Sequence, residues 1–517
     1  ELPQSDVELR LAEIWRKVLH IDHIGIHENF FERGGDSIGC IQIAGMAREA
    51  GLSVSPNHIF EHPTIAALAA AVSSGLKTHA DQGVVSGRVP LTPIQHWFFE
   101  LQNPDPSHWN QSVTLQANEP VDDDVFKQAV SALMSHHDIL RARFRTENGS
   151  WTQTIVEHAG PPPVDTFDLT GFPEVQLEER VRERMAFVQT GLDIERGPVL
   201  RFGLVHRGRE LPDLIFAVIH HLAVDAVSWR VVLDDLERAY DLAFRGKPVT
   251  FPPKTTSYKH WANRLRAVAD DAAIKGDFDY WRTRKPVSRI PSDGIRGPNT
   301  SESSESIRVS LDASHAASLL DKSQRGPGAK LLDFLATGLA EALGEWTQRR
   351  SVAFNLEMHG REHAFDDVDL SRTAGWFTSV FPIHIDLGAD SDAADRFRYV
   401  AEQVHEARRH GLGYGLLRYA GSGAPEAAEL LPRLAEVSLN YMGALDRLAA
   451  PGRRFTPNSP IDGLRGNYHP ESIRPCSIEI NGYSDAEGIH FHWTFSRNMH
   501  RAETIERVAN AFVQRLK

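Results

Sequence analysis

The sequence predicts a small all-α domain followed by a larger α/β domain built from two lobes. The chain has 517 residues, which is more than one hydrophobic core usually holds. Helical periodicity fills residues 1–75, whereas strand-like and helix-like patterns are mixed from 91 to 517. A polar stretch rich in Ser and Gly divides the second part into an N-lobe of about 91–290 and a C-lobe of about 300–517.

The composition is that of an ordinary globular protein, with 41% hydrophobic and 24% charged residues. The net charge of −13 excludes an electrostatic case for binding nucleic acid or an anionic membrane surface. No apolar run approaches the roughly 20 residues that span a bilayer. Cys40 and Cys476 suggest neither a disulfide framework nor a zinc cluster, so we expect a cytoplasmic protein without a metal. Because the chain begins without Met, we expect a piece of a longer protein.

The first 75 residues contain the helix start and stop signals of a helical bundle. Apolar spacing predicts a first helix over 7–19 capped by Asp6, and a second helix that follows the turn GGDS and is closed by Gly51. Pro63 opens a last short helix. The two glycines permit a tight exposed turn that places the Ser37 hydroxyl at a helix N-terminus. Taken alone, GGDS is typical of a helix cap.

The surroundings of Ser37 indicate more than a cap. FFERGGDSIGCIQIAGMAREAGLSV, followed by IFEHPTIAALA, resembles the four-helix peptidyl carrier (thiolation) domains of nonribosomal peptide synthetases across residues 1–75. The resemblance implies that Ser37 carries a covalent 4′-phosphopantetheine arm, attached by a phosphopantetheinyl transferase. It also makes Asp36 informative, because GGDS is typical of carriers that precede an epimerization domain. Ten acidic and five basic residues in this unit predict docking on basic partner surfaces.

A connector follows the first unit. Residues 76–90 mix Ser, Gly and charge without periodicity, and this pattern predicts a flexible linker. Such a tether raises the local concentration of the carrier at a neighbouring active site.

The larger unit combines short apolar runs with helical segments. Helices are predicted near 126–135 and 331–347. Strands are predicted around 113–115, 139–145, 199–206, 214–220, 351–356, 380–385, 476–482 and 488–495.

The segment LIFAVIHHLAVDAVSW, residues 214–229, is the strongest candidate for chemistry. Its apolar run predicts a buried strand, and helical spacing begins at Ser228. His220 and His221 therefore lie at the end of a strand, where their side chains point to opposite faces and only one can enter a given cleft. An isolated HHxxxD equally fits one core histidine, one surface histidine and an Asp225 that holds the turn.

A second set of polar residues lies in NLEMHGREH, residues 355–363, which contains Glu357, His359 and Arg361. By itself this segment is typical of a solvated loop. Together with PIQHWF, HHLAVDAVSW, LLDFLATGLAEALGEW, SRTAGWFTSVFP, GLGYGLL and EVSLNYMG, it resembles the epimerization domains of nonribosomal peptide synthetases over nearly all of 91–517.

That resemblance implies the chloramphenicol-acetyltransferase-like fold of the condensation superfamily, with two α/β lobes and an active site in a tunnel between them. HHxxxD is shared by the superfamily, whereas EMHGRE and RTAGWFTS resemble the epimerase signatures. Ala226 and Met358 stand where glycine is usual, and Met442 stands where leucine is usual. None of these departures removes an ionisable group.

The implied reaction is inversion at Cα of an L-aminoacyl or peptidyl thioester to a D/L mixture. The resemblance implies that His221 and Glu357 face the Cα from the two lobes, one as base and the other as acid. Asn440 and Tyr441 are assigned to the enolate or to positioning. Asp225 and His220 are expected to be structural, while His359 and Arg361 shape their loop or contact the phosphate of the arm.

Three other functions fit parts of the sequence. The first is a peptide-bond-forming condensation domain, the second is a degenerate docking domain without activity, and the third is a free-standing acyltransferase. The expected partners are an upstream adenylation domain, a downstream condensation domain and the carrier itself, docked within the chain.

Overall fold

The computed structural model describes residues 3–517 apart from 20, 36, 53, 73–79, 159, 209, 285–288, 295–296, 326–329, 362–364, 366, 389–391, 422, 445–452 and 459–465. Asp36 and the first residues of the predicted linker lie outside this description, as does the side chain of Ser37.

The N-terminal unit is a bundle of α1 (Asp6–Leu19), α2 (Ser37–Glu49), α3 (Pro56–Glu61) and α4 (Ile65–Ala71). The predicted cap of α1 is wrong: the Ser5 hydroxyl accepts from the backbone of Glu8, and the Glu8 carboxylate accepts from the backbone of Ser5. The last short helix, α4, was expected to open at Pro63, and it begins at Ile65 with Thr64 as its cap. Trp15 and Phe30 meet edge to face in the core, which the bundle closes without help from the rest of the chain.

The N-lobe contains a five-stranded sheet and a smaller three-stranded sheet. The larger sheet has the order β12 (Phe455–Pro457), β2 (Asn110–Ala117), β7 (Leu214–His220), β6 (Leu200–His206) and β5 (Val164–Asp168). The smaller sheet consists of β1 (Gly87–Val89), β4 (Ser150–Ile155) and β3 (Ala142–Glu147). The helical elements of this lobe are α5 (Pro93–Glu100), α6 (Asp123–His136), η1 (Asp138–Arg141), α7 (Glu174–Gln189), η2 (His221–Ala223), α8 (Ala226–Phe244) and α9 (Tyr258–Val268).

Strand β7 is buried on both faces, as its apolar run predicts. Ile215, Ala217 and Ile219 belong to the core that includes α6 and α8. The alternate residues Phe216 and Val218 belong to smaller clusters on the side of α7. The period of two therefore accounts for a continuous apolar run between two helical layers. The predicted strand at 139–145 is only partly correct, because its first residues form η1.

The C-lobe is built on a six-stranded sheet with a helical outer layer. Its order is β10 (Ser379–Asp386), β9 (Ser351–Met358), β11 (Val437–Ala444), β13 (Ile478–Asp485), β14 (Gly488–Ser496) and β8 (Ser304–Asp312). Its helices are α10 (Ala272–Arg282), α11 (Ala313–Arg325), α12 (Leu331–Thr347), α13 (Ala393–Arg409), α14 (Gly411–Tyr419), α15 (Ala424–Leu430) and α16 (Ala502–Leu516). None of the described helices is long and apolar enough to cross a membrane.

Two segments join the lobes. Strand β12, from the C-terminal half of the chain, pairs with β2 of the N-lobe sheet. Trp376 and Phe377, which precede β10, pack into the N-lobe core. The second half of the predicted flexible linker is also anchored to the N-lobe, since β1 pairs with β4 and the Val85 backbone donates to Asp138. That part of the flexibility prediction is wrong.

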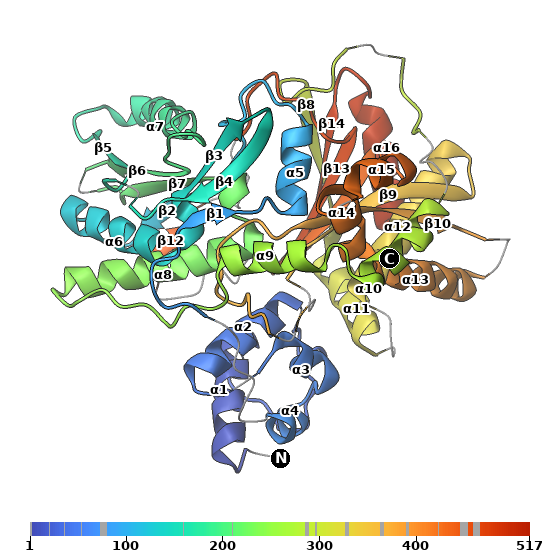
Figure 1. Ribbon diagram of the computed structural model, residues 1–517, viewed down its shortest axis with the longest axis horizontal. Coiled ribbons are helices and arrows are strands. Elements are labelled where there is room, and N and C mark those ends of the chain that lie inside the picture. Colours follow the sequence, from blue (N-terminus) through green and yellow to red (C-terminus); the bar gives the residue numbers. More distant parts are fainter. Residues whose placement is uncertain are drawn as a thin grey trace.

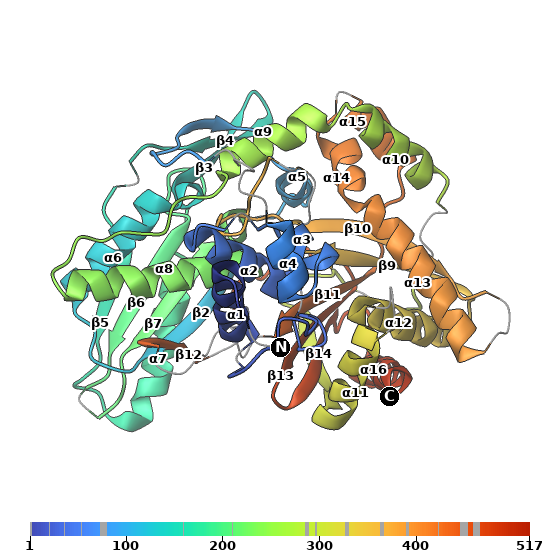
Figure 2. The same ribbon diagram turned by 90° about the horizontal axis from the view of Figure 1, so that it is seen from below.

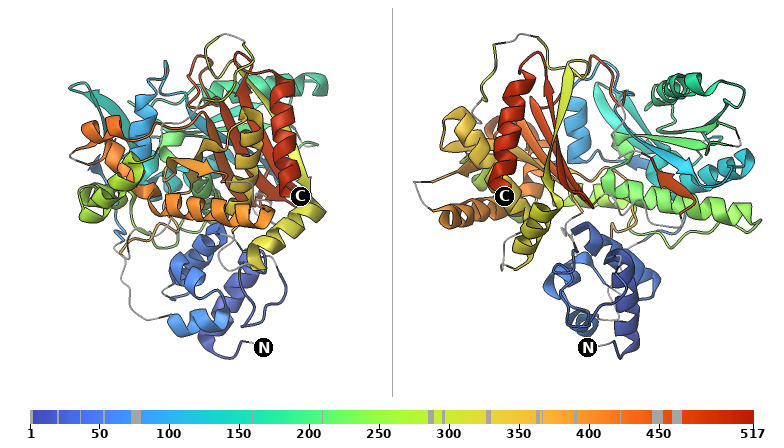
Figure 3. Two further views of the ribbon diagram at one scale, coloured as in Figure 1. Left: turned by 90° about the vertical axis from the view of Figure 1, so that its right-hand side faces the viewer. Right: turned by 180° about the vertical axis from the view of Figure 1, so that it is seen from behind.

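The two lobes stand side by side, and the N-terminal bundle lies below the region where they meet (Figure 1). Figure 2 shows this arrangement from below, with α1 to α4 in front of the inner ends of both lobes. The two views of Figure 3 agree that α2 is the helix of the bundle that lies toward the lobes.

Candidate active site

A cavity of about 2870 Å³ lies between the lobes and reaches the N-terminal bundle. His221 lines it from the N-lobe, and Glu357, Asn440 and Tyr441 line it from the C-lobe. The structure thus brings the four predicted catalytic residues to one cavity although they are far apart in the sequence.

His221 is held as a neutral imidazole with a defined tautomer. Its Nδ1–H donates to the carbonyl of Val224 at 2.8 Å, which leaves Nε2 as the acceptor of the ring. The amide of Gln111 donates to that Nε2 at 3.1 Å, and the orientation of the amide is fixed because its oxygen accepts from the Trp229 indole at 3.0 Å. Burial lowers the pKa of His221, which favours the neutral ring. The ring stacks on Trp376, with 4.2 Å between centroids.

Glu357 has an environment that favours a protonated carboxyl group. Burial raises its pKa, and the nearby Glu479 carboxylate adds to the increase. The Ser438 hydroxyl donates to Glu357 Oε1 at 2.7 Å and opposes that shift. The net direction is upward, so Glu357 can hold a proton nearer neutrality than an exposed glutamate can.

The three central strands of the C-lobe sheet place a block of polar side chains on the cavity. Along β11, Ser438 is level with Asn355 on β9 and with Glu479 on β13. Two residues further on, Asn440 is level with Glu357 and Asn481 and donates to the latter side chain at 3.1 Å. The intervening residues Leu356, Leu439 and Ile480 are buried in the core on the opposite face. Strand alternation therefore creates the block.

Asp225 and Arg361 form a buried ion pair at 3.0 Å that connects the lobes. Asp225 caps α8 by accepting from Ser228 at 2.7 Å, and it also accepts from the backbone of Phe377. Arg361 donates to the carbonyls of Leu370 and Thr373 and lies over the Phe377 ring. These contacts favour a structural role for both residues. Of the two roles expected for Arg361, they favour shaping of the loop over contact with a phosphate, because its guanidinium is buried and bound to protein groups.

His220 and His359 also support local structure. His220 is fully buried, donates from Nε2 to the carbonyl of Pro106 at 2.8 Å, and accepts at Nδ1 from Leu222. His359 lines the cavity and accepts at Nδ1 from the backbone of Arg361. Gly360, which lies between His359 and Arg361, has φ +64°. A Cβ there would lie 1.7 Å from the Phe377 carbonyl oxygen, so this turn requires glycine.

The departures from the family pattern all line the cavity, namely Ala226, Met358 and Met442. Ala226 and Met358, which stand where glycine is usual, therefore add side-chain volume at the wall of the site.

Sequence reasoning missed Gln111, Trp376, Ser438, Glu479 and Asn481. Ser438 had a usable signal, because it lies two residues before Asn440, and two residues at that spacing share a face if the segment is a strand. Gln111 had none, since its contact with His221 depends on the pairing of β2 with β7.

The N-terminal unit contributes Gly34, Gly35 and Ile41 to the same cavity. Helix α2 begins at Ser37, directly after these glycines, and Gly34 has φ +90°, a value that glycine adopts readily. A group attached at the start of α2 would therefore enter the cavity that His221 and Glu357 line. This arrangement fits a long, flexible prosthetic arm.

Comparisons with known proteins agree with the architecture. The family described as "Condensation domain" matches residues 85–517, and the one described as "Phosphopantetheine attachment site" matches residues 10–72. A linear gramicidin synthase polypeptide of Brevibacillus parabrevis is 38% identical over 530 residues, covering 100% of this chain and 7% of the relative. Chondramide synthase cmdD of Chondromyces crocatus is 38% identical over 522 residues, covering 99% and 13%. The chain thus spans a small part of these relatives.

Among solved structures, the epimerization domain from the third module of tyrocidine synthetase B aligns with a TM-score of 0.75 and 29% identity. It covers 85% of this chain and 97% of that chain. The X-domain from teicoplanin biosynthesis, with a TM-score of 0.68 and 21% identity over 86% of this chain and 96% of its own, shares the fold.

Two lobes around an HHxxxD histidine, preceded by a phosphopantetheine attachment domain, define a carrier fused to a catalytic domain of the condensation superfamily. More particularly, the chain belongs to the condensation domain family of nonribosomal peptide synthetases over residues 85–517, and its first unit is a carrier domain that bears 4′-phosphopantetheine on a serine.

Proposed function

We propose that the two-lobed domain epimerizes the Cα of an L-aminoacyl or peptidyl thioester carried on Ser37, giving a D/L mixture. The supporting observation is that a neutral imidazole and a partly buried carboxyl group with a raised pKa line one cavity from opposite lobes. When bound, phosphopantetheine presents the acyl group as a thioester, which acidifies the hydrogen at Cα.

Proton transfer on two faces accounts for the inversion. In one direction Nε2 of His221 removes the proton from Cα, and Glu357 delivers its proton to the other face. In the reverse direction the carboxylate of Glu357 is the base and the imidazolium of His221 is the acid. Asn440 and Tyr441 are assigned to the negative charge that develops on the thioester oxygen, or to positioning.

The assignment is tested by loading Ser37 with an L-aminoacyl group and incubating the whole chain in D₂O. We expect deuterium at Cα together with a mixed D/L product. Unchanged configuration without exchange would contradict the proposal. Replacement of His221 by Ala or of Glu357 by Gln should each slow inversion by about 10²-fold or more, because one positioned acid or base contributes that much. Ser37→Ala should block attachment of the arm while the fold is retained.

A second candidate function is peptide-bond formation, which is favoured by the match to the condensation family. In that reaction His221 would assist an amine that attacks a thioester. Adding a second acylated carrier distinguishes the two, because peptide product supports condensation, while inversion without the second carrier supports epimerization. The alignment with an epimerization domain at 29% identity supports the first function.

The proposal also names the partners of this chain. The chain covers only 7% and 13% of two synthetases. From the family resemblance of its two units, we propose that an adenylation domain precedes the carrier and a condensation domain follows the epimerase in the longer protein. A phosphopantetheinyl transferase would modify Ser37.

A further inference from the structure

One face of carrier helix α2 is turned toward the two-lobed domain. Cys40, Ile43 and Ala47 belong to the core of the carrier. Ile41 and Ala44 are buried but lie outside that core cluster, and Ile41 lines the cavity. Together with Gly45 and Arg48 they follow the spacing i, i+3, i+4, i+7 of a single helix face. This docking face is defined as residues 41, 44, 45 and 48.

The docking face meets a short loop of the two-lobed domain, residues 369–373, which we call the docking loop. A Cβ placed on Gly45 would lie 3.7 Å from the Ser371 Cβ and 3.7 Å from Arg372 Cγ. Arg48 forms an ion pair with Asp369. Its side chain is 31% exposed, whereas that of Asp369 is only 6% exposed. The contact is therefore close, and one partner of the ion pair is almost fully removed from water.

Hydrogen bonds within the two-lobed domain fix the position of Asp369 independently of the carrier. Its backbone exchanges two hydrogen bonds with Thr256, each 2.9 Å long. Its Oδ1 accepts from the backbone of Ser371 at 2.9 Å, which leaves Oδ2 as the atom that meets Arg48. Because this carboxylate is already fixed, it loses little further conformational entropy when it pairs with a correctly placed cation, and the interaction is strong.

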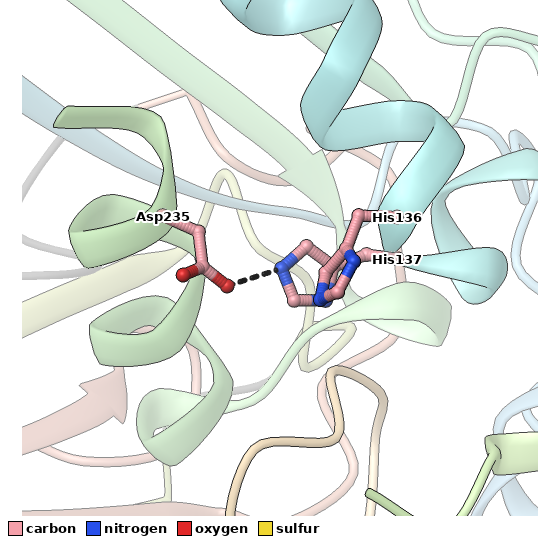
Figure 4. A group of neighbouring side chains, drawn as sticks. All are labelled: His136, His137 and Asp235. Carbon is pink, nitrogen blue, oxygen red and sulfur yellow. Dashed lines mark hydrogen bonds and ion pairs between the residues drawn. The ribbon is translucent and has the colours of Figure 1, made fainter. Parts of the chain in front are cut away.

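The other end of the docking loop rests on the group shown in Figure 4, where His137 and Asp235 share a hydrogen bond beside His136. These three side chains have the types and spacing of metal ligands. Both oxygens of Asp235 are already engaged, with His137 Nε2 at 2.9 Å and Arg372 at 2.5 Å. A guanidinium beside the carboxylate disfavours a second cation, so this group is better explained as an anchor for Arg372.

The charge that the carrier supplies at the docking loop is opposite to the net charge of the carrier as a whole. Residues 1–75 contain ten acidic and five basic residues, which predicts docking on a basic surface. At the docking loop the carrier instead supplies the cation and the two-lobed domain supplies the carboxylate. The single basic side chain on the docking face therefore opposes the general charge of the domain that carries it.

We propose that Asp369 selects the carrier by requiring a cation at position 48 of α2, and that this pair holds the carrier at the mouth of the cavity. The inference deepens the proposed function, on which it depends only for the reaction that follows docking. A like charge at position 48 leaves the buried carboxylate of Asp369 without a partner, and the carrier is then rejected.

Docking can be measured without catalysis by trapping a disulfide between Cys residues introduced by Gly45→Cys and Ser371→Cys. The Cβ separation of 3.7 Å suits a disulfide, and the native Cys40 and Cys476 are buried. The experiment uses the full chain with Ser37 unmodified, so that the arm makes no contribution. The rate of trapping under mild oxidation reports how often the docking face meets the docking loop.

In this background Arg48→Gln should slow trapping about fivefold, as expected for a partly buried ion pair. Asp369→Asn, which keeps an oxygen for the Ser371 backbone, should slow it equally. The double variant should be no slower than either single variant, because each change removes the same interaction. Arg48→Lys should retain most of the rate. Arg16→Gln and Asp124→Asn make the same charge changes away from the contact and should leave trapping unchanged.

Equal trapping by Arg48→Gln and Arg16→Gln, or additive effects in the double variant, would overturn the proposal, provided that the melting temperatures are unchanged. Cα deuterium exchange by the loaded chain is then measured in the same variants. If trapping shows the coupling but even the parent chain exchanges nothing, the docking proposal stands and the proposed epimerization fails. If the chain exchanges deuterium but trapping shows no coupling between positions 48 and 369, the proposed epimerization stands and the docking proposal fails.

Discussion

The Gln111 amide donates to Nε2 of His221, the nitrogen assigned to proton abstraction, across 3.1 Å. The direction of this hydrogen bond is determined because Trp229 occupies the amide oxygen. A donor on the ring lone pair stabilises the neutral imidazole and opposes its protonation. Gln111 is thus a positioning residue that acts through His221, and the substrate Cα–H must take its place during catalysis.

Gln111→Glu should raise the pKa of His221, because a carboxylate in the same place stabilises the imidazolium. In the direction of the reaction in which His221 is the base, activity requires the neutral ring. The acidic limb of that pH–rate profile should therefore move upward by about one unit. The measurement is the initial rate of Cα deuterium exchange as a function of pH.

Gln116→Glu, on the same strand but on its other face, is the matched control and should leave the profile unchanged. A lower rate at every pH with no displacement of the acidic limb would show that Gln111 only supports the fold.

Ser438→Ala should displace the pH–rate profile of the reaction. The hydroxyl donates to the Glu357 carboxylate at 2.7 Å and so stabilises its charged form. Without it the pKa of Glu357 rises further. Glu357 then keeps its proton to higher pH, so the basic limb of the pH–rate profile should move upward by about one unit.

The measurement is the initial rate of Cα deuterium exchange as a function of pH. Ser438→Thr retains the hydroxyl and should keep the parent profile. A lower rate at every pH, with no displacement of the basic limb, would argue for a distorted strand instead of a changed pKa.

The sequence was informative wherever short-range pattern decides the structure. The apolar run before His220 predicted β7 with its observed bounds, and alternation at the strand end correctly separated a buried His220 from a cavity-lining His221. Asp225 was expected to be structural, and it caps α8. Motif resemblance added Glu357, Asn440 and Tyr441, which no local pattern would have singled out.

The remaining features depend on contacts between distant segments. The partner of Asp225 is Arg361, 136 positions later, and no periodicity connects them. The pairing of β12 with the N-lobe sheet could not be predicted from the sequence either, because three residues are too few to show strand alternation. Ile41 and Ala44 fit a helix core by spacing, and only the placement of the carrier shows that they face another domain.

His136 should make stability depend on pH. Burial lowers its pKa from 6.5 to about 3. Below about pH 6.5 the unfolded chain takes up a proton at this position while the folded chain does not, so stability falls as the pH decreases toward 3. His136→Gln removes this contribution. The difference in free energy of unfolding between about pH 7.5 and about pH 5.5, measured by urea titration, should be smaller in the variant. An unchanged difference would contradict a partly buried, neutral imidazole.

Breaking the buried pair between Asp225 and Arg361 should be costly to stability. Arg361→Met keeps the length of the side chain but leaves the Asp225 carboxylate buried without its cation and the carbonyls of Leu370 and Thr373 without their donor. Removal of one partner of a buried pair typically destabilises by about 3–5 kcal/mol.

An exposed pair provides the control for this prediction. Arg398 and Asp395 are 72% and 54% exposed, so Arg398→Met should cost no more than about 1 kcal/mol. Because Arg361 also anchors the docking loop, its variant should slow disulfide trapping of the carrier even at temperatures where the protein remains folded. Urea titration and trapping are measured on the same samples. A loss of stability similar to that of Arg398→Met, with trapping unaffected, would show that the ion pair neither connects the lobes nor holds the loop.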